Sequence, residues 1–251
     1  MNKALSSVFA IVTALLLSTS ANASAPIFST DFNSSLPIEI SPGVATQTGV
    51  QGYAGYGPVG DQFGGDFLRS PTGNTVTLTL TGLSSHTSLS LEFLFAAIDS
   101  LDGTGSFPEG DFFRVDLDGV TIFRESFANA TPSQIQSYIP PTGVELAHRI
   151  DLGFSGPGGF FTDSAYNMGL DPTFQNIAHT GSTATFTFII EGPGIQPLDD
   201  ESWAMDNLRV SVSPVPEPET YALFMAGLGL MGFIAVSKRR TNIHAGLENY
   251  S

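Results

Sequence analysis

Aspartates near the ends of alternating apolar segments are the residues of this sequence best suited to chemistry. Asp206 lies two residues before Leu208 and four before Val210, and Asp111 stands in the same relation to the apolar residues of 113–117. Alternate residues of a β-strand share a face, so both acids are expected to point inward with their apolar partners. A buried carboxylate is unfavourable by several kcal/mol unless it is paired with a cation or bound to a metal.

Cations that could pair with these acids are scarce. The chain has a net charge of −15, and between Ser24 and Val215 it has 21 acidic residues against five arginines and no lysine. Such a surface repels nucleic acid and anionic lipid, and it serves either solubility or cation binding. The cation we expect is calcium, a hard ion that takes about six to eight oxygen ligands.

The candidate calcium ligands lie at strand ends or in acidic loops, and they are Asp99, Asp102, Asp111, Asp200 and Asp206. Their spacing is not that of an EF-hand loop. The alternative is that these carboxylates accept hydrogen bonds from backbone N–H groups of neighbouring loops.

Signatures of catalysis are missing from the sequence. There is no cysteine, the four histidines are not spaced as zinc ligands, and no G-x-S-x-G motif is present. A retaining glucanase of the jelly-roll kind would need closely spaced glutamates on one strand, whereas the glutamates here are well separated. We therefore expect a non-enzymatic protein, with a hydrolase of extracellular polysaccharide as the alternative.

Three aromatic residues are candidates for a surface on which a sugar ring could stack: Tyr53, Tyr56 and Trp203. The alternative is that they anchor the core or a loop, as buried aromatic residues commonly do.

The elements that must position these groups are β-strands. Five segments alternate with a period of two, which predicts half-buried strands, and they span residues 75–81, 89–97, 112–117, 183–190 and 208–212. Asp118 and Gly119 lie between two such runs and predict a type I′ hairpin. Residues 155–182 show no clear period and predict a large loop, with or without a short helix. The fold class expected is all-β, an antiparallel β-sandwich of a jelly-roll kind.

Three acidic segments, residues 98–103, 111–119 and 200–210, resemble the loops and closing strand of concanavalin A-like or carbohydrate-module-like sandwiches. In those folds a closing strand with an acid, a tryptophan and an Asp-Asn pair often lies beside a structural calcium. The resemblance therefore implies such an ion here and supports Asp111 and Asp206 more than the other candidates.

The first 23 residues have the order of a secretory signal peptide. Lys3 precedes an apolar run over residues 4–17, and the small residues 21–23 end in Ala23, after which signal peptidase is expected to cut. The alternative, an uncleaved anchor, is disfavoured because the apolar run is short for a membrane span.

The last 39 residues have the features of a second targeting signal. The proline-rich segment 213–220 must be extended, since proline fixes φ and lacks an N–H group. Residues 221–236 are apolar and uncharged, and they predict a transmembrane helix in the precursor, although a short one. The basic cluster Lys238, Arg239 and Arg240 is expected to stay cytoplasmic, which places the preceding domain on the outer side of the membrane.

Val215–Pro218, the glycine-rich apolar segment and the basic cluster resemble the PEP-CTERM sorting domain in their order and spacing. The resemblance implies recognition by an exosortase-type membrane protease and cleavage close to Pro216, Glu217 and Pro218. It also implies attachment or release of the domain outside the cell, in association with exopolysaccharide and biofilm matrix.

The predicted organisation is a signal peptide (1–23), a β-sandwich domain (24–212), a linker with the sorting motif (213–220), a transmembrane helix (221–236) and a basic cytoplasmic tail (237–251). The function expected is that of an exported envelope or matrix protein that binds glycan or another matrix component and holds a structural calcium. A purely structural surface protein without a ligand is the further alternative. The sequence contains no sign of a nucleic-acid partner.

Overall fold

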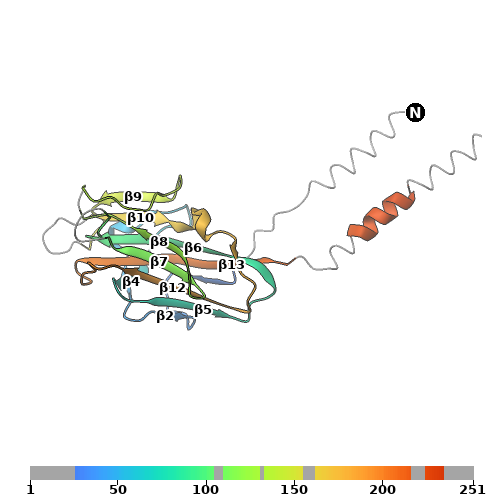
Figure 1. Cartoon of the computed structure of the whole chain (residues 1–251), viewed down its shortest axis with the longest axis horizontal. Coiled ribbons are helices and arrows are strands. Elements are labelled where there is room, and N and C mark those ends of the chain that lie inside the picture. The colour runs from blue at the N-terminus through green and yellow to red at the C-terminus, as the bar shows by residue number, and fades with distance from the viewer. Residues whose placement is uncertain (1–25, 105–109, 131–132, 155–161, 216–223, 235–251) are drawn as a thin grey trace, which may run out of the picture. The chain divides into compact units, whose positions relative to one another are not determined.

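A computed structural model of the chain describes residues 26–104, 110–130, 133–154, 162–215 and 224–234 (Figure 1). The chain divides into two compact units, residues 1–213 and residues 214–251. The predicted cleavage site at Ala23, the motif residues Pro216, Glu217 and Pro218, and the basic cluster Lys238, Arg239 and Arg240 lie outside the described residues.

The first unit is built from antiparallel β-strands. Their bounds are β1 Phe28–Thr30, β2 Ile40–Ser41, β3 Thr46–Gly49, β4 Asp66–Pro71, β5 Val76–Thr81, β6 His86–Asp99, β7 Phe112–Leu117, β8 Val120–Ser126, β9 Glu145–Ile150, β10 Asp163–Asn167, β11 Ile177–Ala178, β12 Thr183–Glu191 and β13 Glu201–Pro214. Three short 3₁₀ turns, η1 Gln51–Tyr53, η2 Met168–Leu170 and η3 Pro172–Phe174, lie between strands.

The strands form two sheets that face each other. The eight-stranded sheet has the order β3-β4-β13-β6-β10-β9, with β1 also paired to β13 and β11 to β6. The five-stranded sheet has the order β2-β5-β12-β7-β8. The predicted all-β, antiparallel sandwich is therefore confirmed.

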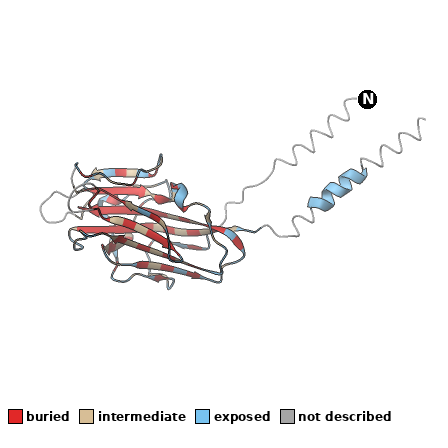
Figure 2. Cartoon of the chain, in the orientation of Figure 1, coloured by how far each residue is buried: buried red, intermediate tan, exposed pale blue. Residues whose placement is uncertain are grey.

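The main core lies between the two sheets and follows the alternation of the sequence. Along β5 the side chains of Val76, Leu78 and Leu80 are buried, whereas Thr79 and Thr81 are exposed. The same contrast of buried and less buried residues runs along β12 (Figure 2). Burial of apolar surface between two such faces is the main driving force for this arrangement.

A second apolar cluster covers the outer face of the eight-stranded sheet. Long β6 is buried on both faces: Phe93 and Phe95 belong to the main core, while Leu94 and Ala96 belong to the outer cluster. Residues 50–65, which connect β3 to β4, fold over this outer face and contribute the aromatic side chains of Tyr53 and Phe63. The outer face of the eight-stranded sheet is therefore covered by a loop at these residues and is not exposed to solvent there.

The β7–β8 hairpin has the turn that its sequence predicts. Asp118 and Gly119 have φ angles of +52° and +78°, which is the pair of positive values that a type I′ turn requires. The amide of Asp118 also donates a hydrogen bond of 2.8 Å to the carbonyl oxygen of Thr185 in β12. The turn is thus fixed to the neighbouring strand.

Strand β13 changes face in its middle. Trp203 and Met205 lie in the main core, and so does Leu208, although the step from Met205 to Leu208 is three residues. Asn207 has a φ of +50°, so an extra residue is accommodated there as a β-bulge. The inward orientation predicted for Asp206 from its parity with Leu208 is therefore wrong.

The segment 155–182 is not one large loop. Its described part contains strands β10 and β11 and two 3₁₀ turns. Strand β10 pairs with β6 on one side and β9 on the other, and four of its five residues are buried. A strand buried on both faces has no alternation of apolar and polar residues, which is why its sequence lacks the expected period.

In the second unit, residues 224–234 form a short helix. Within the described residues, no helix has both the length and the apolar character needed to cross a membrane. The predicted transmembrane helix is therefore not confirmed.

Candidate metal centre and surface groove

Three buried carboxylates meet at one end of the sandwich. Asp102 lies in the loop after β6, Asp111 immediately precedes β7, and Glu201 is the first residue of β13. A carboxylate oxygen of each lies within 4.8 Å of the others, and the three residues are at most 3% exposed. The two sheets thus both contribute to a compact acidic cluster.

The alternation of the strands explains why these acids point inward. Asp111 has the parity of Phe113 and Val115, which both lie in the main core. Glu201 has the parity of Trp203, which lies in the same core, because the bulge comes only later in β13. The inward orientation predicted for Asp111 agrees with this arrangement.

Neighbouring groups hold the carboxylates in place. Gln134 donates a side-chain hydrogen bond to Asp102 Oδ1. Gln196 donates two bonds of 2.9 Å to Glu201, one from its backbone amide and one from its side-chain amide. The cluster is therefore built from fixed side chains.

Two oxygens of the cluster have no hydrogen-bond partner among the described residues. They are Asp102 Oδ2 and Asp111 Oδ1, both buried. An unsatisfied buried carboxylate oxygen is costly, since it has lost its hydration without replacement. These two atoms are therefore available to a cation.

Burial also raises the affinity of the cluster for positive charge. The pKa values of Asp102, Asp111 and Glu201 are all raised, in each case chiefly because burial disfavours the charged form. The Asp111 carboxylate raises the pKa of Glu201 further. A proton or a metal ion is needed to offset this concentration of negative charge.

The glycine at the end of β12 leaves room beside the cluster. A Cβ atom on Gly192 would lie 2.6 Å from the carbonyl oxygen of Gly110 and 3.3 Å from Asp111 Oδ1. Any side chain here would press on the backbone and on the oxygen that lacks a partner. An all-oxygen set of this kind suits a hard cation such as calcium, with further ligands from backbone carbonyls and water.

The other predicted calcium ligands lie elsewhere. The side chain of Asp99, at the end of β6, is 3.8 Å from Arg69 Nη2, and Asp200 Oδ1 accepts a bond of 3.0 Å from Ser100. Asp206 lies under the loop of the outer cluster and accepts bonds from the amides of Gly64 (3.2 Å) and Asn207 (2.7 Å). Of the five predicted ligands, only Asp102 and Asp111 belong to the cluster.

Glu201 is the ligand candidate that sequence reasoning missed. The signal that could have identified it is its position two residues before the single tryptophan, since alternate residues share a face. An inward tryptophan therefore implied an inward Glu201.

The predicted aromatic surface does not form. Tyr53 and Trp203 are fully buried, so neither offers a ring to a ligand. The hydroxyl of Tyr53 donates a 2.9 Å bond to the carbonyl oxygen of Ala97, and the Trp203 ring lies 5.4 Å from that of Phe113. Tyr56 is only partly buried and packs against the outer cluster. The alternative reading of Tyr53 and Trp203, as core anchors, is the one that the structure supports.

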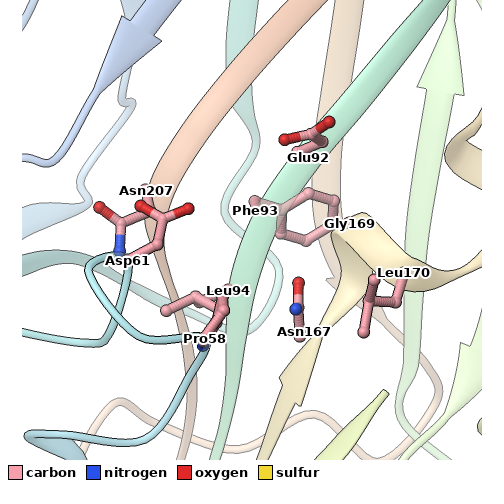
Figure 3. A pocket seen from close by; sticks show the side chains of 9 residues that line it. All are labelled: Pro58, Asp61, Glu92, Phe93, Leu94, Asn167, Gly169, Leu170 and Asn207. Atoms are coloured by element: carbon pink, nitrogen blue, oxygen red, sulfur yellow. The ribbon is translucent and has the colours of Figure 1, made fainter. Parts of the chain in front are cut away.

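A surface pocket of about 240 Å³ lies on the eight-stranded sheet (Figure 3). Its lining combines carboxylates, amides and apolar groups, contributed by Pro58, Asp61, Glu92, Phe93, Leu94, Asn167, Gly169, Leu170 and Asn207. We call this pocket the face groove. Glu92 comes from β6, Asn167 from the end of β10 and Asn207 from the bulge in β13, so three adjacent strands supply its polar groups.

The two carboxylates of the face groove differ in their partners. Asp61 forms a two-pronged ion pair with Arg209. Glu92 makes no such pair in the described structure and is partly exposed. Asn207 donates a bond of 3.1 Å to the carbonyl oxygen of Gln62, which leaves its side-chain oxygen available. The groove therefore presents both hydrogen-bond donors and acceptors.

Fold and tail together define an exported β-sandwich protein. Residues 214–240 match the PEP-CTERM protein-sorting motif, which confirms the resemblance drawn from the sequence and implies export. This match covers the tail and not the sandwich.

Several solved structures resemble the chain at low identity. The CBM22-2 xylan-binding domain of Paenibacillus barcinonensis Xyn10C is 12% identical over 74% of this chain and 99% of its own, with a TM-score of 0.31. The C-terminal CBM6 of LamC from Zobellia galactanivorans is 13% identical over 74% of this chain and 93% of its own, with a TM-score of 0.24. The Agl-KA catalytic domain is 15% identical over 78% of this chain, with a TM-score of 0.32, and the chain spans 29% of its length. No curated protein matches the chain.

Proposed function

We propose that this chain is a non-enzymatic protein of the cell envelope or extracellular matrix. Its C-terminal signal delivers it outside the cell and is removed there by an exosortase-type protease. Its sandwich holds a structural calcium ion at Asp102, Asp111 and Glu201, and it binds a matrix glycan in the face groove.

The calcium assignment is supported by the two buried oxygens without hydrogen-bond partners, Asp102 Oδ2 and Asp111 Oδ1. A calcium ion beside them would be ligated by carboxylates from both sheets. Such an ion would stabilise the closed end of the sandwich in a chain that has no disulfide. Its role is therefore structural, because the cluster is buried and shares no residue with the lining of the face groove.

The observation that carries the binding role is the set of polar groups in the face groove. A sugar hydroxyl both donates and accepts hydrogen bonds, and the groove offers the Glu92 carboxylate beside the amides of Asn167 and Asn207. The exposed side chain of Leu170 lines the same pocket and can cover the C–H face of a sugar ring.

The ion pair of Asp61 favours binding over hydrolysis. Glycoside hydrolases generally need two carboxyl groups, one of them a general acid and the other a base or nucleophile. Within the described lining of the groove, Asp61 is paired with Arg209. Glu92 therefore has no second unpaired carboxylate beside it to act as its catalytic partner.

The test is binding of the full chain to exopolysaccharide from its own host, measured by affinity electrophoresis with the variants Glu92→Gln and Asn167→Ala. We expect each variant to weaken retention roughly fivefold, as the loss of about one hydrogen bond implies. Glu39→Gln, which removes an exposed acid outside the groove, is the matched control and should behave as the parent chain does.

Two outcomes would overturn the proposal. Equal retention of the parent chain and both groove variants would remove the face groove from any binding role. A steady release of reducing sugar ends by the parent chain, lost in Glu92→Gln, would make the protein a hydrolase.

A further inference from the structure

Two histidines form a continuous chain of hydrogen bonds at the edge of the sandwich. His86 Nδ1 lies 2.6 Å from the carbonyl oxygen of Ser84, and His86 Nε2 lies 2.7 Å from His179 Nδ1. His179 Nε2 in turn lies 3.1 Å from Asp118 Oδ2. The two rings are nearly parallel, with centroids 5.0 Å apart. We call these groups the histidine array.

The array joins the two sheets. His86 is the first residue of β6 and His179 directly follows β11, and both strands belong to the eight-stranded sheet. Asp118 lies in the β7–β8 turn of the five-stranded sheet, where its Oδ1 accepts a bond of 2.8 Å from the amide of Thr185 in β12. A side-chain connection therefore runs from one sheet to the other through two imidazole rings.

The two histidine rings of the array are largely shielded from water, whereas its carboxylate is partly exposed. His86 is 2% exposed and the His179 side chain 7%, whereas the Asp118 side chain is 45% exposed. In the described structure the carboxylate of Asp118 is the charged group bonded to the rings, and the loop before β6 and strand β12 contribute only backbone groups. The array can therefore be treated as two rings and one carboxylate.

The groups at the two ends of the array, the Ser84 carbonyl oxygen and the Asp118 carboxylate, determine how many protons the array needs. The carbonyl oxygen of Ser84 can only accept, so His86 Nδ1 carries a hydrogen and His86 Nε2 accepts. His179 Nδ1 must then donate to His86, which would leave Nε2 of a neutral His179 as an acceptor facing the Asp118 carboxylate. Three hydrogen bonds need three protons, whereas two neutral imidazoles supply two.

We propose that the histidine array holds one additional proton and acts as a pH-sensitive clamp between the sheets. The additional proton lies between His179 and Asp118. Loss of this proton at higher pH leaves two acceptors facing each other and breaks the connection to the five-stranded sheet. A second additional proton, at low pH, would place two N–H groups between the rings and break the bond between His86 and His179. Histidine is the side chain that ordinarily changes charge between about pH 5 and 8.

The decisive variant is Asp118→Asn. An asparagine side chain can donate an N–H to His179 Nε2 while its oxygen accepts from Thr185, so two neutral rings then complete all three hydrogen bonds. An Asn-Gly pair is also a preferred sequence for a type I′ turn, so the hairpin is retained. The substitution removes the need for the proton and keeps the clamp.

The first measurement is the melting temperature of the full chain between about pH 5 and 9. We expect the parent chain to lose about 2–4 °C relative to Asp118→Asn as the pH rises from about 6 to 8, the effect of roughly one hydrogen bond. His148→Gln is the matched control, because His148 lies on β9 and pairs with Glu145 instead. It should follow the parent chain. Superimposable pH profiles for the parent chain and Asp118→Asn would overturn the proposal.

The second measurement uses only the parent chain and covers the case in which the variant does not fold. Nitrogen chemical shifts of the imidazole rings report how many protons each ring carries. We expect His86 and His179 together to take up one proton as the pH falls from about 8 to 5. Uptake of two protons by the pair over this range would contradict a shared-proton array.

Discussion

The backbone amide of Asp102 donates a hydrogen bond of 2.7 Å to Asp111 Oδ2, and the amide of Asp111 donates one of 2.9 Å to the carbonyl oxygen of Asp102. These reciprocal bonds hold two acidic residues together although their charges repel. The carboxylates are thus fixed in position before any ion binds, which lowers the conformational cost of binding.

Calcium is expected to raise the stability of the folded chain. At a free concentration about 100 times the dissociation constant, ligand binding adds about 2.7 kcal/mol to the free energy of unfolding, or roughly 5–10 °C in melting temperature. Differential scanning calorimetry in calcium and in chelator measures the difference. Identical melting temperatures would contradict the metal centre.

Substitution of one ligand distinguishes calcium binding at the cluster from general attraction of calcium by neighbouring acidic residues. Asp111→Asn should raise the dissociation constant for calcium by at least about tenfold, or about 1.4 kcal/mol, as measured by isothermal titration calorimetry. Asp200→Asn is the matched control, because Asp200 is adjacent to Glu201 but lies outside the cluster. A tenfold loss in the control as well would indicate diffuse electrostatic attraction rather than a defined site.

Substitution of the glycine beside the cluster should be destabilising. The Cβ atom of Gly192→Ala would meet the carbonyl oxygen of Gly110 at 2.6 Å, so the backbone must shift at a cost of about 1–3 kcal/mol in the free energy of unfolding. Gly64→Ala, whose nearest contact would be an ordinary 3.8 Å, should be nearly neutral. Urea denaturation of both variants checks this, and equal midpoints would show that the end of the sandwich is loosely packed.

Asp206 is expected to give the stability a pH dependence of its own. Burial raises the pKa of Asp206 to about 7, so the folded chain retains a proton that the unfolded chain releases near pH 4. A group of this kind stabilises the fold at low pH, and its contribution is lost as the pH rises from about 4 to 7.

The variant Asp206→Asn cannot titrate and should remove this contribution. Urea denaturation at a series of pH values measures it, with an expected limit of about 1.4 kcal/mol per pH unit for the parent chain. If the parent chain and the variant show the same slope, Asp206 is already ionised in the fold at pH 5.

The sandwich was predictable from sequence where one face of a strand is exposed. The threonines of β5 and β12 alternate with buried apolar residues, and Asp118 with Gly119 encodes the hairpin turn. Strand β10 escaped prediction because it is buried on both faces and its sequence therefore has no alternation.

The candidate site was predictable in part, for reasons of local geometry. Asp111 follows the regular alternation of β7, whereas Asp206 is displaced by the bulge at Asn207, which a count of alternate residues cannot detect. Asp102 and Asp111 are joined by their reciprocal hydrogen bonds, and Glu201 lies near Asp102 because β13 neighbours β6 in the eight-stranded sheet. Their proximity depends on sheet order, which a single sequence does not reveal.

Delivery by the sorting signal is tested by the intact mass of the protein recovered from its own host, with and without the exosortase-type protease. We expect a mature chain that begins at Ser24 and ends within residues 216–218, and a longer chain when the protease is absent. A mass that retains residues 221–251 under both conditions would mean that the tail is not processed, and delivery by the sorting signal would be contradicted.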